Sequence, residues 1–181
     1  MRRIAMVLAA LALNSLALTA CVAPEAGPPE PEPAIPPIAQ DQSRPRLALV
    51  EHVLADYFAQ DISTRPTVCA SVVESGAQRG LVAEEETALI LRFEQLAPFA
   101  RCENKGGQWR DTASGDPALV FAIHTFACQQ DTSCTGTAGY QAGGAGAPAY
   151  RYTMDWLDGK WTFGRDPMII AEDEAQGAAV R

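Results

Sequence analysis

The sequence has few basic residues and few histidines. Its 181 residues include 14 Lys and Arg against 22 Asp and Glu, for a net charge of −8, and only two His. No local cluster of Lys and Arg stands out, so we expect no binding to nucleic acid through phosphate contacts. Apolar residues make up 48% of the chain, which favours a globular domain over disorder along its whole length.

Sequence motifs for catalysis are also missing. The chain contains no Gly-x-Ser-x-Gly nucleophile elbow and no Cys-x-x-Cys redox motif. The glycine-rich residues 136–146 lack the Gly-Lys-Ser/Thr ending of a phosphate-binding loop, and we expect residues 135–148 to form a hairpin loop between two strands. We therefore assign no catalytic residues and expect no cofactor and no metal, which favours a protein that is not an enzyme.

Residues 1–20 are typical of an export signal. Arg2 and Arg3 give a cationic start, and residues 4–18 are rich in Ala, Leu and Val. The following Leu18-Thr19-Ala20-Cys21 resembles the lipobox of bacterial lipoproteins. This resemblance implies that residues 1–20 are removed as a signal peptide and that the Cys21 thiol carries fatty-acyl chains such as palmitate. The alternative is an uncleaved transmembrane helix, but the apolar run is shorter than the roughly 20 residues that a bilayer span needs.

The lipoprotein resemblance also implies a location and partners. Val22 stands after the lipidated cysteine in place of Asp, which in such lipoproteins favours transfer to the outer membrane. We therefore expect a lipid-anchored protein of the bacterial cell envelope, on the outer membrane and facing the periplasm. The membrane is then a partner through the lipid on Cys21, and an envelope protein or wall component is a candidate second partner.

The chain divides by composition after the signal peptide. Residues 21–45 are rich in Pro and Glu and should form an extended tether, because proline fixes φ and has no amide donor. A ligand for a PxxP-binding protein is the alternative for such a composition. We expect a single disulfide-stabilised domain at residues 46–172 and a flexible tail at residues 173–181.

Hydrophobic periodicity predicts two helices and several strands in this domain. Residues 46–60 and 83–97 carry apolar residues at helical spacing, with His52 and Asp56 on the outer face of the first helix. Residues 67–73 and 118–127 are apolar or β-branched and are predicted strands. His124, in the second of these strands, is expected to be a hydrogen-bonded core residue.

A hairpin near the C-terminus is the firmest structural prediction. Asp158-Gly159 supplies the two positive-φ residues of a type I′ turn, which places Trp156 opposite Trp161 and Met154 opposite Phe163. The large apolar residues of the hairpin then share one face. The predicted fold class is α+β, with a curved antiparallel sheet packed on one face by two amphipathic helices. The order of elements loosely resembles the cystatin-like and NTF2-like cone folds.

The cysteines predict disulfides. The four that remain besides Cys21 are Cys69, Cys102, Cys128 and Cys134. An even number in an exported domain favours two disulfides. Of the three pairings we favour Cys69–Cys102 with Cys128–Cys134, because a polar loop that can fold back separates the latter two. The alternative is a metal site from His124, Cys128 and Cys134, whose spacing matches no common zinc motif.

Two functions from different classes fit these features. The first is a non-catalytic binding or structural domain whose partner surface lies away from the face of Trp156 and Trp161. The alternative is a small-ligand-binding or enzymatic cone-fold domain with a pocket on the concave face of the sheet. The residues expected to line that pocket are His124, Tyr150, Tyr152 and Trp161. Helices that cover this face favour the first function, whereas an open cavity favours the second.

Overall fold

The structure is a computed structural model that describes residues 35–142 and 148–170. A compact unit begins at Ile35, so residues 35–44, which the sequence assigned to the tether, belong to the folded part of the chain. The predicted signal peptide, Cys21, the rest of the tether and the predicted tail lie outside the described residues. Within the described ranges, no helix is long and apolar enough to cross a membrane.

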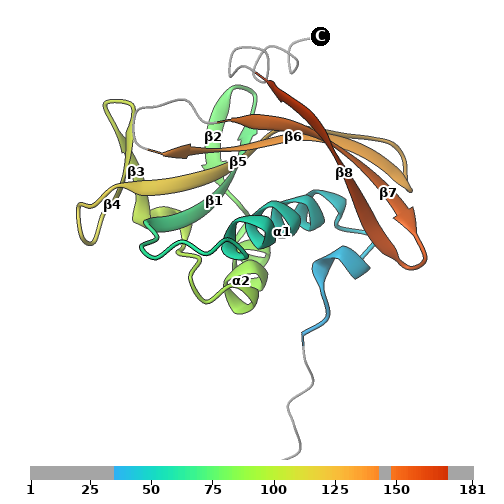
Figure 1. The fold of residues 1–181 in the computed structure, drawn as a ribbon, viewed down its shortest axis with the longest axis horizontal. Helices are drawn as coiled ribbons and strands as arrows, with labels where there is room; N and C mark the ends of the chain where they lie inside the picture. Colours follow the sequence, from blue (N-terminus) through green and yellow to red (C-terminus); the bar gives the residue numbers. More distant parts are fainter. Residues whose placement is uncertain (1–34, 143–147, 171–181) are drawn as a thin grey trace, which may run out of the picture. The chain divides into compact units, whose positions relative to one another are not determined.

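The described residues form two α-helices, two short 3-10 helices and eight strands (Figure 1). The helices are η1 (Ile38–Gln40), α1 (Pro45–Phe58), α2 (Ala83–Arg92) and η2 (Phe99–Arg101). The first four strands are β1 (Thr67–Glu74), β2 (Ala77–Gly80), β3 (Cys102–Lys105) and β4 (Gln108–Asp111). The remaining strands are β5 (Ala118–Gln130), β6 (Ser133–Ala142), β7 (Ala149–Leu157) and β8 (Lys160–Ile170).

Six of the strands form one sheet in the order β2-β1-β5-β6-β7-β8, and β3 pairs with β4 in a separate hairpin. The protein is therefore a mixed α+β fold with a mostly antiparallel sheet, as predicted. The prediction of a wholly antiparallel sheet is wrong at one pair, because β1 runs parallel to β5 from Thr67↔Ala118 to Val72↔Ile123. Parallel neighbours need a long crossover, and here α2 and the β3–β4 hairpin supply it.

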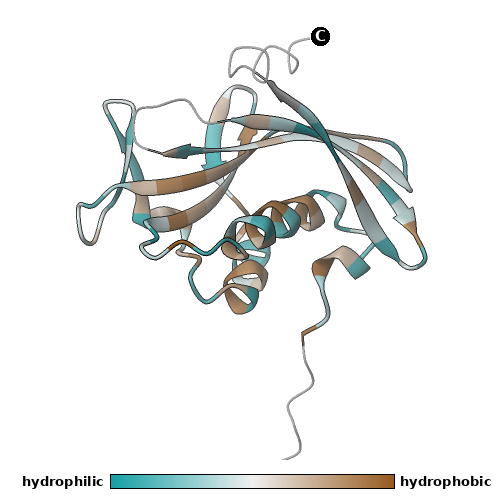
Figure 2. Cartoon of the chain, viewed as in Figure 1, coloured by the Kyte–Doolittle hydropathy of each residue, from teal (hydrophilic) through white to brown (hydrophobic). Residues whose placement is uncertain are grey.

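Helix α1 lies against one side of the sheet, and α2 lies on the same side (Figure 1). Pro45 begins α1 at a position where its missing amide donor costs nothing. Leu47, Val50 and Leu54 of α1 are almost fully buried and join a core cluster with apolar residues of the sheet. Figure 2 shows apolar segments on α1, on α2 and on the strands of the sheet.

Helix α2 is shorter than predicted, since it ends at Arg92 and not at residue 97. Phe93 makes the last helical bond, from its amide to the carbonyl of Leu89 at 2.8 Å. The chain then turns to pair with β1, where the amide of Ala97 donates to the carbonyl of Val68 at 2.8 Å. Pro98 follows directly, and a proline disfavours helical backbone at the residue before it.

The C-terminal hairpin has the predicted register. Asp158 and Gly159 adopt φ of 51° and 75°, and Trp156 pairs with Trp161 as Met154 pairs with Phe163. The pairing shifts by a bulge between Tyr150 and Tyr152. The register predicted from the turn is thus confirmed for the residues next to the turn. The bulge lies farther along the strands.

The glycine-rich segment is a strand over much of its length, which corrects the predicted loop at 135–148. Residues Ser133–Ala142 form β6, and residues 143–147 lie outside the described residues. A Cβ at Gly136 would lie 2.6 Å from Cδ2 of Leu49 in α1, and one at Gly139 would lie 2.9 Å from Cα of Ala149 in β7. These glycines therefore allow α1 and the neighbouring strand to approach β6 closely.

A second apolar cluster lies on the other side of the sheet. Cys69 of β1 and Val120 of β5 join Cys102 and Trp109 of the β3–β4 hairpin in this cluster. Successive side chains of a strand point to opposite faces, so β1 and β5 are covered on both faces. The expectation of cover on one face alone is corrected here, and the double cover explains why β5 is apolar at nearly every position.

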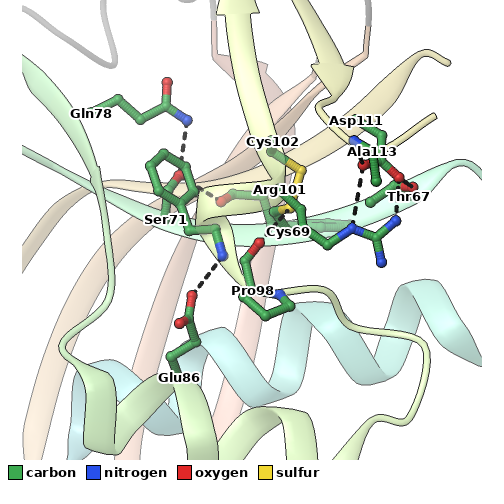
Figure 3. Close-up of a disulfide and its surroundings, with 12 residues drawn as sticks. Thr67, Cys69, Ser71, Gln78, Glu86, Pro98, Arg101, Cys102, Asp111 and Ala113 are labelled. Carbon is green, nitrogen blue, oxygen red and sulfur yellow. Dashed lines mark hydrogen bonds and ion pairs between the residues drawn. A yellow bond between two sulfur atoms is a disulfide. The ribbon is translucent and has the colours of Figure 1, made fainter. Parts of the chain in front are cut away.

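The β3–β4 hairpin is fixed to the sheet by a disulfide and a buried carboxylate (Figure 3). The disulfide joins Cys69 to Cys102. Asp111, only 2% exposed, accepts a hydrogen bond from Thr67 Oγ1 at 2.6 Å and forms an ion pair with Arg101. Hydrogen bonds from Arg101 and then Thr67 hold the pKa of Asp111 far below its usual range, so this carboxylate is charged at neutral pH.

Candidate binding pocket

A pocket of about 180 Å³ lies between the C-terminal half of α1 and strands β5 to β8. Helix α1 supplies residues three and four positions apart, which share one helical face, and Gln60 follows just beyond the end of the helix. The strands supply residues that face the helix. The lining residues are Val53, Asp56, Tyr57, Gln60, Phe121, Ala138, Gly139, Tyr140, Pro148, Tyr150, Tyr152 and Arg165.

The floor of the pocket is aromatic. Tyr57, Phe121 and Tyr152 are buried, with exposed fractions of 7%, 6% and 4%. The Tyr57 and Phe121 rings meet edge to face with centroids 5.3 Å apart, and Phe121 lies 5.5 Å from the ring of Tyr140. Aromatic rings in such a wall offer a flat apolar surface to a second ring. The floor therefore suits a small ring-shaped group.

The mouth of the pocket is polar and carries both charges. Asp56 of α1, Gln60 just after α1 and Arg165 of β8 line it and are exposed. The Arg165 guanidinium lies over the Tyr150 ring, 4.8 Å from its centroid, in a cation–π arrangement. A molecule in the pocket would thus contact apolar rings at its inner end and charged groups at its outer end.

Burial affects the two tyrosine hydroxyl groups of the floor. Burial raises the pKa of Tyr57, and burial also raises the pKa of Tyr152 although hydrogen bonding from Arg165 opposes it. Both hydroxyl groups therefore keep their protons at neutral pH. A protonated phenol can donate one hydrogen bond to a ligand oxygen.

His52 lies next to this pocket, which corrects its predicted place on the outer face of α1. Its ring stacks on Phe163 of β8 at 4.2 Å and meets Tyr152 edge to face at 5.9 Å. Its Nε2 lies 3.8 Å from a carboxylate oxygen of Asp56. Burial lowers the pKa of His52, while the charge of Asp56 raises it and that of Arg165 lowers it, so the ring is neutral at neutral pH.

The structure brings together two of the four residues expected to line a pocket. Tyr150 and Tyr152 line the pocket described above. Trp161 is 2% exposed in the core, where its indole Nε1 donates to the carbonyl of Asp41 at 3.2 Å. His124 is buried and lines a separate pocket of about 190 Å³ with Arg46 and Glu74. The expected grouping is therefore not formed.

Both disulfides follow the pairing favoured from the sequence. Besides Cys69–Cys102, Cys128 is joined to Cys134, its direct cross-strand partner between β5 and β6. The alternative metal site at His124 required Cys128 and Cys134 as thiolate ligands. Because their sulfur atoms are bonded to each other, this alternative is wrong.

Sequence reasoning missed Asp56, Tyr57, Gln60 and Arg165 as pocket residues, although signals for some of them were present. The spacing of Val53, Asp56 and Tyr57 places them on one face of α1. The register of the Asp158-Gly159 turn also pairs Arg165 with Tyr152. The sequence did not indicate which face of the helix packs on which strands.

No protein-family model, curated protein or solved structure compared with the chain matches it.

Proposed function

We propose that this protein is a lipid-anchored component of the bacterial cell envelope whose domain binds a small molecule without transforming it. The observation that carries the binding role is the pocket at the α1 face of the sheet, with buried aromatic rings below and charged groups at its mouth. Its volume is below the roughly 300–1,000 Å³ of sites for drug-sized ligands. The ligand is accordingly small, of about the size of one substituted ring.

The chemistry of the lining supports binding over catalysis. A general base needs a proton-accepting group that reaches the substrate. Tyr57 and Tyr152 keep their protons because burial raises their pKa. The carboxylate that lines the pocket belongs to Asp56, whose side chain is 54% exposed, and the neutral ring of His52 lies beside the pocket but is not one of its lining residues. The pocket is thus suited to hold a ligand in place.

The finer features of the fold fit the same proposal. We propose that the sheet curves around an amphipathic α1 as in the cystatin-like and NTF2-like cone folds. The support is the set of register irregularities between Ile123 and Thr125, between Cys128 and Gln130, and between Tyr150 and Tyr152, since β-bulges bend the strand that contains them. A bent sheet keeps its strands near α1 at one end and leaves room for a pocket at the other.

The binding role is tested with indole as a probe and isothermal titration as the measurement. We expect saturable binding by the wild-type domain and at least a tenfold weaker affinity in Ala138→Leu, because Ala138 is buried in the lining and a larger side chain would fill the pocket. Ala142→Leu, at the exposed end of the same strand, is the matched control and should bind as wild type does.

Two results would contradict the binding role. One is the absence of saturable indole binding at millimolar concentrations, and the other is equal binding by wild type and a folded Ala138→Leu variant. Thermal unfolding shows whether Ala138→Leu has folded. If it has not, Tyr150→Ala serves instead, because the half-buried Tyr150 ring forms part of the wall and its loss should weaken indole binding.

The anchor is tested by Cys21→Ser in the full-length precursor. We expect metabolic labelling with a fatty-acid analogue to mark the wild type and not the variant, because the lipobox resemblance makes the Cys21 thiol the site of lipid attachment. The variant should also leave the membrane fraction, since two or more acyl chains hold a protein at a bilayer far more firmly than one. Equal labelling of both proteins would refute the anchor.

A further inference from the structure

The mouth of the pocket presents one negative and one positive group from different elements. Asp56 comes from α1 and Arg165 from β8, and both line the opening above the aromatic floor. Asp56 lies 3.8 Å from Nε2 of His52, and Arg165 is the cross-strand partner of Tyr152. The rings of His52 and Tyr152 meet with centroids 5.9 Å apart, so both charged residues lie near the same pair of rings. A ligand that fills the floor therefore has a carboxylate and a guanidinium beside its outer end.

The negative charge of Asp56 is available to a ligand. Its nearest basic neighbour in α1 is His52, with Nε2 at 3.8 Å. Because this histidine is neutral at neutral pH, it does not cancel the charge of the carboxylate. More than half of the Asp56 side chain is exposed, so an ammonium group can approach it without displacing a protein cation.

The positive charge of Arg165 is also available, because the contact of its guanidinium carbon with the Tyr150 ring, 4.8 Å from the centroid, does not neutralise it. A guanidinium carries five N–H donors, and a cation–π contact leaves most of them able to donate to another acceptor. Hydrogen bonding to Tyr152 accounts for part of this donor set. The rest can bind a carboxylate, for which the planar fork of arginine is well matched.

We infer that the ligand of this pocket is a small zwitterion with a ring-shaped apolar body, such as an aromatic amino acid. The ring lies on the floor formed by Tyr57, Phe121 and Tyr152, the ligand carboxylate binds Arg165 and the ligand ammonium binds Asp56. This inference rests on the proposed function, since it names the chemical class of molecule that the pocket binds.

The test compares four probes that share a ring and differ in charge. L-phenylalanine carries both charges, 3-phenylpropionate only the carboxylate, 2-phenylethylamine only the ammonium, and indole neither. We expect isothermal titration to show phenylalanine binding at least tenfold more tightly than either singly charged probe, and indole more weakly still. Each missing charge removes one charge-assisted contact, and the free energy of such a contact corresponds to about a tenfold change in affinity.

Two charge-removing variants assign the contacts. Arg165→Gln should abolish the advantage of phenylalanine over phenylethylamine, and Asp56→Asn should abolish its advantage over phenylpropionate. Arg151→Gln and Asp155→Asn remove the same charges from exposed positions on β7 outside the pocket lining. These two controls should leave all four affinities unchanged, and an equal loss in the controls would overturn the assignment.

The outcomes separate this inference from the proposed function. One outcome is that indole binds the wild type, Ala138→Leu weakens that binding, and phenylalanine binds no more tightly than indole. The pocket is then a binding site, and the zwitterion inference is wrong. If phenylpropionate or phenylethylamine equals phenylalanine, one of the two charged contacts is wrong and the inference fails. If none of the four probes binds, both proposals fail.

Discussion

Trp161→Ala is expected to lower the free energy of unfolding by about 3–5 kcal/mol, the usual cost of truncating a buried aromatic residue. Trp161 is 2% exposed and pairs across the hairpin with Trp156, whose ring centroid lies 5.4 Å away. Its indole also donates to the carbonyl of Asp41, so the substitution removes both packing and a link to the segment before α1. Urea denaturation measures the change.

Trp156→Ala is the matched control for this prediction. Trp156 sits opposite Trp161 in the same hairpin but is only half-buried, so its loss should cost clearly less. Equal costs for the two substitutions would contradict the packing described here. A Trp161→Ala variant of unchanged stability that loses ligand binding would instead place the binding site at Trp161.

Glu51→Ala is expected to lower the free energy of unfolding by about 2–4 kcal/mol, because removing the buried carboxylate leaves two backbone amides and the partly exposed Arg92 without their acceptor. Glu51 is 4% exposed and forms an ion pair with Arg92 of α2. Its two carboxylate oxygens also accept the amides of Ile38 at 3.2 Å and Ala39 at 2.9 Å. Thermal and urea unfolding of the variant measure the loss.

Two further substitutions define the cause of this loss. Glu84→Ala removes a carboxylate from the exposed first turn of α2 and should change stability by no more than about 0.5 kcal/mol. Glu51→Gln keeps the size and the acceptor oxygen but not the charge, and should fall between wild type and Glu51→Ala. If Glu51→Ala is no more destabilising than Glu84→Ala, the ion pair and its amide contacts do not stabilise the fold.

The parts of the fold that the sequence predicted are those with local causes. The turn at Asp158-Gly159 sets the register of its hairpin because two positive-φ residues allow one turn type. The start of α1 follows from Pro45 and the apolar spacing after it, and the disulfide Cys128–Cys134 follows from a short polar connection. In each case, residues within about ten positions of one another determine the outcome.

The parts that the sequence did not predict depend on contacts between distant segments. Residues of β6 look like a loop because glycine is disfavoured in strands. Gly136 is needed in this strand because a Cβ there would collide with Leu49 of α1. The parallel pairing of β1 with β5 requires knowing where the crossover between them lies. Glu51 belongs to no sequence motif, and its burial depends on Arg92, 41 positions along the chain (92 − 51).

The candidate site shows the same division. Tyr150 and Tyr152 could be selected from the alternation of the hairpin, and Arg165 follows from the register of its turn. Asp56 and His52 were placed on the outer face of α1, because a charged residue and a histidine are commonly solvated there. Their place beside the sheet depends on how α1 is rotated against β8, which no short sequence pattern specifies.

The attachment of residues 35–44 to the folded unit has a mechanical consequence. This segment is held by Glu51 of α1 through the η1 amides, by Arg92 of α2 at the carbonyl of Ile35 and by Trp161 of β8 at the carbonyl of Asp41. A pulling force on the chain ahead of residue 35 is therefore shared among three elements and does not peel α1 away turn by turn. If the proposed lipid anchor holds the protein by this end, force on the domain passes through the contacts of this segment with α1, α2 and β8 together and not through α1 alone.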